Sequence, residues 1–302
     1  MFFGGALGGL ASVCDVTEIP VIRTLAELRE RTEPVRRSAG RIGLVATMGA
    51  LHEGHLSLIR AAAAECEQVV VTIFVNPAQF NDPGDLDAYP RTEDEDVRLA
   101  TEAGATVIFA PGPEEVYPPG FVTAVRVGGV SEPWEGAARG ASHFDGVALV
   151  VAKLFGMVTP DLAWFGQKDA QQVAVVRRLV ADLNIPTAIR VAPTVREADG
   201  LAMSSRNVRL DAADREAALS LSRGLRLVAD RAAAGDTDAP ALARAGRAVV
   251  EQAGAEVEYF AIVDPGTFAE LDDLGDRDAL AIVAARVGQV RLIDNWELPR
   301  HT

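Results

Sequence analysis

The sequence lacks the residues and patterns that mark several classes of protein. Two cysteines in 302 residues, Cys14 and Cys66, provide neither a disulfide framework nor the spacing of a metal site, which is typical of a reducing cytoplasm. No apolar run reaches the ~18 residues of a membrane-spanning helix. Basic residues number 29 and acidic residues 43, for a net charge of −14. We therefore expect a cytoplasmic protein with no membrane or nucleic-acid partner.

Lysine and histidine are so scarce that their positions carry information. Lys153 and Lys168 are the only lysines, and every other basic residue is an arginine. Because a compact ammonium and a planar guanidinium are not equivalent at a tight site, both lysines are candidates for a specific contact, and chance survival on the surface is the alternative. Three of the four histidines, His52, His55 and His143, lie in segments with other signs of function.

The stretch around the first two histidines predicts a strand, a glycine turn and a helix. Residues 41–46 are an apolar run typical of a buried strand, and apolar residues recur at helical spacing from Leu56 to Ala64. Backbone N–H groups at a helix start suit an anion, and an imidazole donates well to a phosphate oxygen. With His55 opening the helix three residues after His52, this stretch predicts a site for nucleotide phosphates. Two surface histidines beside a turn remain the alternative.

Two other predicted strands end in polar residues. Residues 68–75 are nearly all β-branched and lead into Asn76 and Gln79, whose amides suit a hydroxyl or carboxylate, although a plain Asn-Pro turn explains them too. Residues 161–165 lead into Gly166–Asp169, which combines a glycine, a cation and a helix start. The lysine of that segment is a candidate phosphate contact.

Further charged segments allow two interpretations each. Carboxylates between residues 82 and 96 suit Mg²⁺ bound together with phosphates, but acids at a helix start also favour the helix dipole, and this second interpretation accounts for most of them. Arg139 and His143 precede a predicted helix that reaches Val158. They are candidate anion contacts, with a helix cap or a surface histidine as the alternative.

The order of elements predicts an α/β fold. Strands and helices alternate between residues 41 and 191, which indicates a Rossmann-like, doubly wound parallel sheet with a ligand crevice at its strand ends, and residues 122–127 are expected to add an edge strand. From about residue 210 two alanine-rich helices and three strands indicate a smaller α+β domain. We expect an N-terminal domain over residues 1–194, beginning with a loose extension over 1–16, in close contact with a lid domain over 195–302.

Five motifs, in chain order, resemble those of the pantothenate synthetase family, the pantoate–β-alanine ligases. They are TMGALHEGH (47–55), FVNPAQF (74–80), HFDGV (143–147), FGQKDAQQ (165–172) and MSSRN (203–207). HEGH resembles the HIGH signature of the wider nucleotidyltransferase superfamily. MSSRN resembles the mobile KMSKS loop of class I aminoacyl-tRNA synthetases but lacks its lysine, and Arg206 would serve as the cation. The resemblance runs from about Val21 to Trp296, nearly the whole chain.

The resemblance implies a ligase of pantothenate and coenzyme A biosynthesis. Its reaction is the ATP-dependent condensation of (R)-pantoate with β-alanine to pantothenate, through a pantoyl adenylate, with release of AMP and pyrophosphate. It also implies Mg²⁺ as a cofactor and a homodimeric protein. The absence of an obvious serine or cysteine triad agrees with this chemistry, which depends on positioning and on charge neutralisation.

The resemblance also implies roles for individual residues. Gln79 and Gln172 would bind pantoate, Gln79 would also approach β-alanine, and Asn76 would help to hold its amine. Glu95 and Asp96 match the positions of Mg²⁺ contacts. The catalytic residues would be His55 as proton donor, His52 as phosphate partner, Lys168 and Arg206. The ATP site would comprise Met48, Gly49, His52, His55, Gly166, Lys168, Asp169, Val195, Met203, Ser204, Ser205 and Arg206.

Two features depart from the family pattern, and two other functions stay open. Gln167 stands where the family often has glutamate, and the segment from Arg139 to His143 has one extra residue and no proline, which leaves the role of Arg139 undecided. A nucleotidyltransferase with a different acceptor would share the histidine motif but would have little use for Gln79 and Gln172. A non-catalytic nucleotide sensor would not need His55 and Lys168 together.

Overall fold

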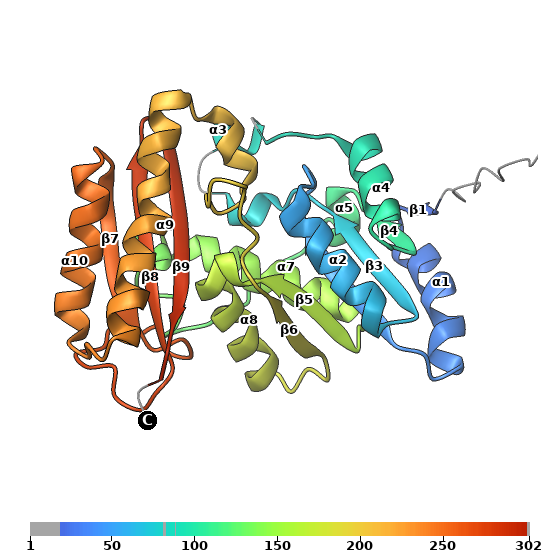
Figure 1. The fold of residues 1–302 in the computed structure, drawn as a ribbon. Helices are drawn as coiled ribbons and strands as arrows, with labels where there is room; N and C mark the ends of the chain where they lie inside the picture. The colour runs from blue at the N-terminus through green and yellow to red at the C-terminus, as the bar shows by residue number, and fades with distance from the viewer. Residues whose placement is uncertain (1–18, 81–82, 88, 301–302) are drawn as a thin grey trace, which may run out of the picture.

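The computed structural model describes residues 19–80, 83–87 and 89–300, and the extension expected over residues 1–16 lies outside them. A six-stranded parallel sheet, in the order β1-β4-β3-β2-β5-β6, forms the first part of the fold (Figure 1). This confirms the predicted α/β class. Its strands are β1 (Val21–Ile22), β2 (Ile42–Thr47), β3 (Gln68–Ile73), β4 (Val107–Phe109), β5 (Leu162–Gly166) and β6 (Ala188–Ala192).

The strand order reverses between β2 and β5. From β2 the chain proceeds through β3 to β4 on one side, and then it returns to place β5 and β6 on the other side. Ligands of open parallel sheets bind beyond the carboxyl ends of the strands at such a reversal. The segments that follow β2 and β5 are therefore the first place to look for a site.

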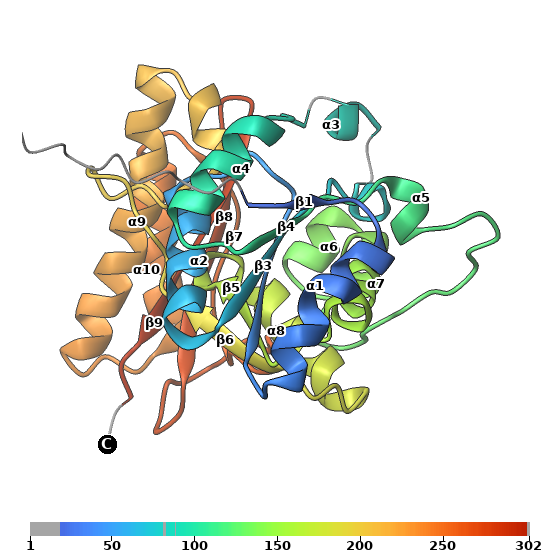
Figure 2. The ribbon, with the colours of Figure 1, turned by 90° about the vertical axis from the view of Figure 1, so that its right-hand side faces the viewer.

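Helices cover both faces of the parallel sheet because its central strands are apolar on both faces. Leu28, Ala148 and Val176, from α1, α7 and α8, share a core with Leu44 of β2. On the opposite face α2 and α4 pack over β2 and β3 (Figure 2). These helices are α1 (Leu25–Arg37), α2 (Glu53–Glu65), α4 (Glu93–Glu102), α7 (Ala141–Val158) and α8 (Ala170–Asp182).

A three-stranded antiparallel sheet, β7-β8-β9, forms the second part. One of its faces is covered by α9 and α10, while Ala261, Val263 and Ile282 on the other face join the core of the first part. The expected close contact of the two parts is confirmed by this shared core. The elements are α9 (Ala212–Ala233), α10 (Ala239–Gln252), β7 (Glu256–Val263), β8 (Ala279–Val287) and β9 (Val290–Leu298).

Short helical segments complete the fold. None of the helices in the described ranges combines the length and apolar character needed to cross a bilayer. The short helices are η1 (Pro77–Gln79), α3 (Pro83–Asp87), α5 (Pro113–Val116), α6 (Glu135–Arg139), η2 (Gln167–Asp169) and η3 (Ser205–Arg209).

One expectation about a strand was wrong. Residues 122–127 form no strand, and Val122 is 92% exposed. A β-branched run becomes a strand only where a neighbour accepts its hydrogen bonds, and no described strand pairs with this segment.

Two glycines of α7 allow a matched test of how closely this helix approaches η1. A Cβ at Gly146 would lie 2.1 Å from the carbonyl oxygen of Ala78, whereas a Cβ at Gly156 would meet nothing within 4 Å. We expect Gly146→Ala to lower the free energy of unfolding by about 1–3 kcal/mol through overpacking. Gly156→Ala should raise it by about 0.5–1 kcal/mol, because alanine is the better helix former. Urea unfolding measures both, and equal effects would contradict the close approach.

Candidate active site

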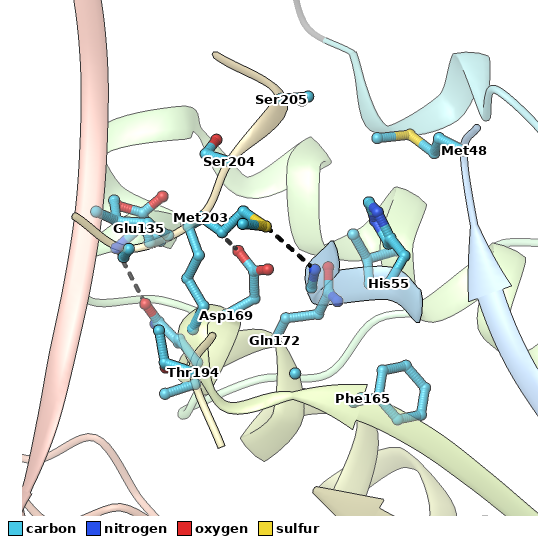
Figure 3. A pocket seen from close by; sticks show the side chains of 18 of the residues that line it. Met48, His55, Glu135, Phe165, Asp169, Gln172, Thr194, Met203, Ser204 and Ser205 are labelled. Carbon is cyan, nitrogen blue, oxygen red and sulfur yellow. Dashed lines mark hydrogen bonds and ion pairs between the residues drawn. The ribbon is translucent and has the colours of Figure 1, made fainter. Parts of the chain in front are cut away.

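A cavity of about 300 Å³ opens where the carboxyl ends of β2 and β5 face the second sheet (Figure 3). Its walls come from the β2–α2 turn, the segment after β3, the start of α8, the loop over residues 193–206, and β9. Among the residues that the resemblance assigns to ATP and substrates, Gly49 alone does not line the cavity. The others are Met48, His52, His55, Asn76, Gln79, Gly166, Lys168, Asp169, Gln172, Val195, Met203, Ser204, Ser205 and Arg206.

The β2–α2 turn is held by one buried carboxylate. Gly49 and Ala50 both have positive φ, at 85° and 51°, a region that alanine rarely adopts. The side chain of Asp96 accepts hydrogen bonds from the backbone N–H of Ala50 (3.0 Å) and of Leu51 (2.7 Å), and Asp96 is only 1% exposed. Asp96 therefore compensates the strain of the turn and fixes where α2 begins.

Two histidines cap the start of α2. His52 is the residue before the helix and His55 its third residue, so the helix begins two residues earlier than predicted. His52 Nδ1 accepts from the N–H of Gly54 (3.2 Å), and His55 Nδ1 accepts from the N–H of His52 (3.3 Å). Because both Nδ1 atoms are acceptors, a neutral ring of either residue carries its proton on Nε2. Each ring is thus a hydrogen-bond donor at Nε2.

Burial keeps both rings neutral. Burial, reinforced by the neighbouring His52, lowers the pKa of His55 to about 3. Burial also lowers the pKa of His52, and the charge of Lys168 adds to this effect. At neutral pH the site thus offers neutral N–H donors rather than two imidazolium ions. Such donors suit phosphate oxygens at a helix N-terminus.

The end of β5 contributes a cation. Lys168 lies in η2, and its side chain is 19% exposed. Its ammonium is 3.8 Å from Asp169 Oδ1. Asp169 opens α8, and the charges of Lys168 and Arg139 hold the pKa of its carboxyl below the usual value although burial opposes them. An ionised carboxylate and an ammonium therefore lie side by side on this wall.

Amide side chains form a second group in the cavity. Asn76 is 1% exposed and fully engaged: its Nδ2 donates to Gln79 Oε1 (3.0 Å) and to the carbonyl of Gly146 (3.1 Å). Its Oδ1 accepts from the hydroxyl of Tyr117 (2.8 Å) and the N–H of Ala78 (3.2 Å). Asn76 is thus placed to orient Gln79, and the amine contact that the resemblance implies stays a prediction. Among the described residues, the hydrogen-bond acceptor of Gln79 Nε2 is a thioether, the Sδ of Met48 (3.0 Å).

The two glutamines that begin α8 have different surroundings. Gln171 is 4% exposed, donates to the carbonyls of Val130 and Pro133, and accepts from the N–H of Glu135. It therefore shapes the loop before α6. The side chain of Gln172 lines the cavity (Figure 3), and no residue in the described ranges forms a hydrogen bond with it.

The far wall combines Glu135 and Arg291, which no motif indicated, with the predicted contacts Arg139 and His143. Glu135 accepts from both terminal nitrogens of Arg291 (2.5 and 2.9 Å) and from the hydroxyl of Tyr259 (2.8 Å), which joins α6 to the second sheet. Arg139 lies 3.4 Å from the same carboxylate. His143 Nδ1 donates to the carbonyl of Gln79 (3.0 Å), so its Nε2 is left to accept from Arg139 Nη1 (3.3 Å).

The loop over residues 193–206 closes the cavity from the side of the second sheet. The N–H of Met203 donates to the carbonyl of Val195 (2.9 Å), and the Met203 thioether accepts from the N–H of Gly54 at the start of α2 (3.3 Å). Ser204 caps η3 by accepting from the N–H of Arg206 (3.3 Å). Within the described part of the chain Arg206 forms no ion pair, so its guanidinium is a cation available to a ligand.

The remaining predicted contacts lie elsewhere. Glu95 pairs with Arg98 (2.7 Å) and Asp96 holds the turn, and neither lines the cavity, so this geometry gives no support to a Mg²⁺ site there. No group of three or more acidic, histidine or cysteine side chains suited to a metal occurs among the described residues. The ammonium of Lys153 lies 4.8 Å from the ring centre of Phe121 and outside the cavity.

Comparison with known proteins decides the family. The sequence profile of the pantoate-beta-alanine ligases matches residues 20–297. The chain belongs to this family. A pantothenate synthetase of Cereibacter sphaeroides is 55% identical over 277 residues, which cover 91% of this chain and 98% of that protein. This confirms the resemblance that the five motifs indicated.

Solved structures of pantothenate synthetases share the fold. That of Thermus thermophilus is 44% identical with a TM-score of 0.85, and the match covers 93% of this chain and all of the other. The pantoate-beta-alanine ligase of Francisella tularensis, solved with β-γ ATP and β-alanine, is 32% identical with a TM-score of 0.75, over 92% of this chain and 97% of that one.

Sequence reasoning missed the contribution of the second sheet to this ligase cavity. Tyr259, Arg291, Asp294 and Asn295 line it, yet they belong to β7 and β9, far along the chain from every motif. Alternation within a strand predicts which side chains share a face, but not which site that face meets. A charged or amide side chain in an otherwise apolar strand was the only available signal.

Burial of the histidines predicts a pH dependence of stability. Burial lowers the pKa of His143 to about 4, below the ~6.5 of an unfolded chain. As pH falls from 7 to 5, the unfolded state therefore takes up a proton that the folded state does not, and the free energy of unfolding falls. We expect His143→Gln to reduce this dependence by about 1 kcal/mol per pH unit between pH 6 and 5. Urea unfolding at both values measures it, and an unchanged slope would refute a neutral His143.

Proposed function

We propose that this chain condenses pantoate with β-alanine at the expense of ATP, giving pantothenate, AMP and pyrophosphate. The observation that carries the proposal is that one cavity contains two groups of side chains, each suited to a different substrate. His52, His55 and Lys168 suit phosphates, and Gln79 and Gln172 suit a small hydroxy acid beside them. The Francisella tularensis ligase, solved in complex with β-γ ATP and β-alanine, agrees with this assignment.

The first step forms pantoyl adenylate. An oxygen of the pantoate carboxylate attacks the α-phosphorus of ATP, the bond to the β-phosphate oxygen breaks, and pyrophosphate leaves. We propose that the Nε2–H groups of His52 and His55 donate to phosphate oxygens and that Lys168 and Arg206 neutralise the charge that grows there. Because His55 is buried and neutral, it acts by donating a hydrogen bond and keeps its proton.

The second step forms the amide bond. The free amine of β-alanine attacks the acyl carbon of the adenylate, AMP leaves with the bonding electrons, and the amine loses a proton. We propose that Gln172 and Gln79 bind the hydroxyl groups of pantoate and hold its acyl carbon in place. Asn76 orients Gln79, since Asn76 Nδ2 donates to the amide oxygen of Gln79. The two thioethers that contact Gln79 and Gly54 would give way to substrate oxygens, which are stronger acceptors.

Mg²⁺ is proposed to arrive with the nucleotide. Of the carboxylates that line the cavity, Glu135 is bonded to Arg291 and Asp294 to Arg196, which leaves Asp169 beside Lys168. The side chains on this wall thus do not form a cage for a metal. Mg²⁺ commonly binds through phosphates with one or two carboxylates, so the ion would neutralise phosphate charge when bound.

Three further expectations remain proposals. We propose that residues 1–194 and 195–302 act as a nucleotide domain and a lid, supported by the loop that places Met203 over the start of α2. We also propose a cytoplasmic homodimer, in keeping with the family resemblance and with the exposed, apolar Val122. Sedimentation equilibrium decides the homodimer, and the mass of a single chain would contradict it.

Exchange of labelled pyrophosphate into ATP tests the proposed reaction. With β-alanine absent, only the formation of the adenylate and its reversal can occur. We therefore expect exchange that requires both pantoate and Mg²⁺. Exchange without pantoate, or with another acid in its place, would indicate a different acceptor. A folded protein that binds ATP without any exchange would favour a nucleotide sensor.

The two lysines provide a matched pair of variants for the same assay. We expect Lys168→Arg to lower the exchange rate by about 10²-fold or more, because a planar guanidinium does not reproduce the point charge of an ammonium in a tight site. Lys153→Arg should leave the rate within about twofold, since Lys153 lies over Phe121 outside the cavity. Similar rates for both variants would exclude a specific role for Lys168.

A further inference from the structure

Two consecutive polar residues of β9 contact the two segments on either side of the proposed nucleotide site. Asp294 and Asn295 are 4% and 5% exposed, and both lie at the cavity wall. Neither belongs to a motif that indicated function. A buried polar pair in an apolar strand is costly unless every polar atom finds a partner, so the partners reveal what the pair does.

The side chain of Asn295 is hydrogen-bonded to the turn that carries Lys168. Its Nδ2 donates to the carbonyl oxygens of Gln167 and Lys168, both at 2.9 Å, and its Oδ1 accepts from Gln167 Nε2 at 3.4 Å. Because these two carbonyls are consecutive, their peptide planes are fixed on either side of the Lys168 Cα. The direction in which the Lys168 side chain leaves the backbone is therefore set by a residue of the second sheet.

Asp294 forms an ion pair with the loop over residues 193–206, on the opposite side of the nucleotide site. Its two oxygens accept from Arg196 at 2.7 and 3.0 Å, and its Oδ1 also accepts from the N–H of Asn295 at 2.8 Å. Arg196 pairs with Ala202 across the base of a hairpin whose far side leads into Met203. The position of the loop that carries Arg206 is therefore tied to the same strand.

We propose that Asp294 and Asn295 are positioning residues that fix where the two cationic walls of the nucleotide site lie relative to each other, one wall carrying Lys168 and the other Arg206. Asn295 orients Lys168, and Asp294 places the loop of Met203–Arg206. β9 thus fixes the spacing between a cation from each part of the chain. The inference rests on the proposed ATP site and assigns the second sheet a function in it beyond covering the cavity.

A double-mutant cycle on ATP affinity tests the pairing of Asn295 with Lys168. The dissociation constant of ATP is measured by calorimetry for the wild-type protein, Asn295→Ala, Lys168→Ala and the double variant. We expect each single variant to bind about tenfold more weakly or worse, and the double variant to bind no more weakly than Lys168→Ala. Effects that multiply, or wild-type affinity in Asn295→Ala, would overturn the proposal. The same cycle on the dissociation constant of ATP, with Asp294→Asn and Arg206→Ala, tests the other wall. A double variant that binds no more weakly than Arg206→Ala supports the proposal, and effects that multiply would overturn it.

Controls separate a failure of positioning from other failures. Thr187→Val removes a buried hydroxyl that donates to the Pro160 carbonyl (2.8 Å) at the far end of β6, and we expect unchanged ATP affinity. Should Asn295→Ala fail to fold, Asn295→Ser retains one donor, and the same cycle with Lys168→Ala applies. A wild-type protein that does not bind ATP would overturn the proposed function itself, whereas normal wild-type binding with additive cycles would overturn the positioning role alone.

Discussion

The hydrogen bonds from the backbone of Ala50 and Leu51 to the Asp96 carboxylate are the constraint on which the rest of the site depends. They hold a left-handed turn that an alanine would otherwise avoid, and this turn directs α2 so that His52, Gly54 and His55 at its start line the cavity. His52 and His55 then cap the helix with one ring nitrogen each and present the other. A carboxylate on α4 thus decides where two imidazoles point.

Charge in the cavity is organised by pairing. Glu135 is bonded to Arg291, and Asp294 is bonded to Arg196, so these buried ions join α6 and the loop over residues 193–206 to the second sheet. Buried pairs of this kind contribute little net stability, but removing one partner leaves an uncompensated buried charge. The pairs therefore favour the one arrangement of segments in which both partners meet. Lys168, at 3.8 Å from its nearest carboxylate, is left to meet the charge of a nucleotide. The histidines stay neutral beside it because their burial opposes a further positive charge.

The sequence predicted the central elements well because they depend on local patterns. The strands predicted over residues 41–46 and 68–75 correspond to β2 and β3, and they follow from runs of apolar residues. The edge strand over residues 122–127 was wrong because a strand needs a partner that a local pattern does not reveal. The contact of Asp96 with the β2–α2 turn was not predicted, since a carboxylate that binds a backbone turn 45 residues away has no local pattern.

By itself, the sequence determined the α/β class, the family and the segments that meet at the strand ends, because each of these depends on patterns within short stretches of contiguous residues. Only the folded structure decided which nitrogen of each histidine is left to donate, because the turn that Asp96 holds from α4 brings a backbone N–H against Nδ1 of each ring. It also decided that Asn76 and Gln171 support their neighbours, and that Asp294 and Asn295 reach the site from the second sheet. Such contacts join residues more than a hundred positions apart in the case of Asn295 and Lys168, and only the packing of one sheet against the other brings them within hydrogen-bonding distance.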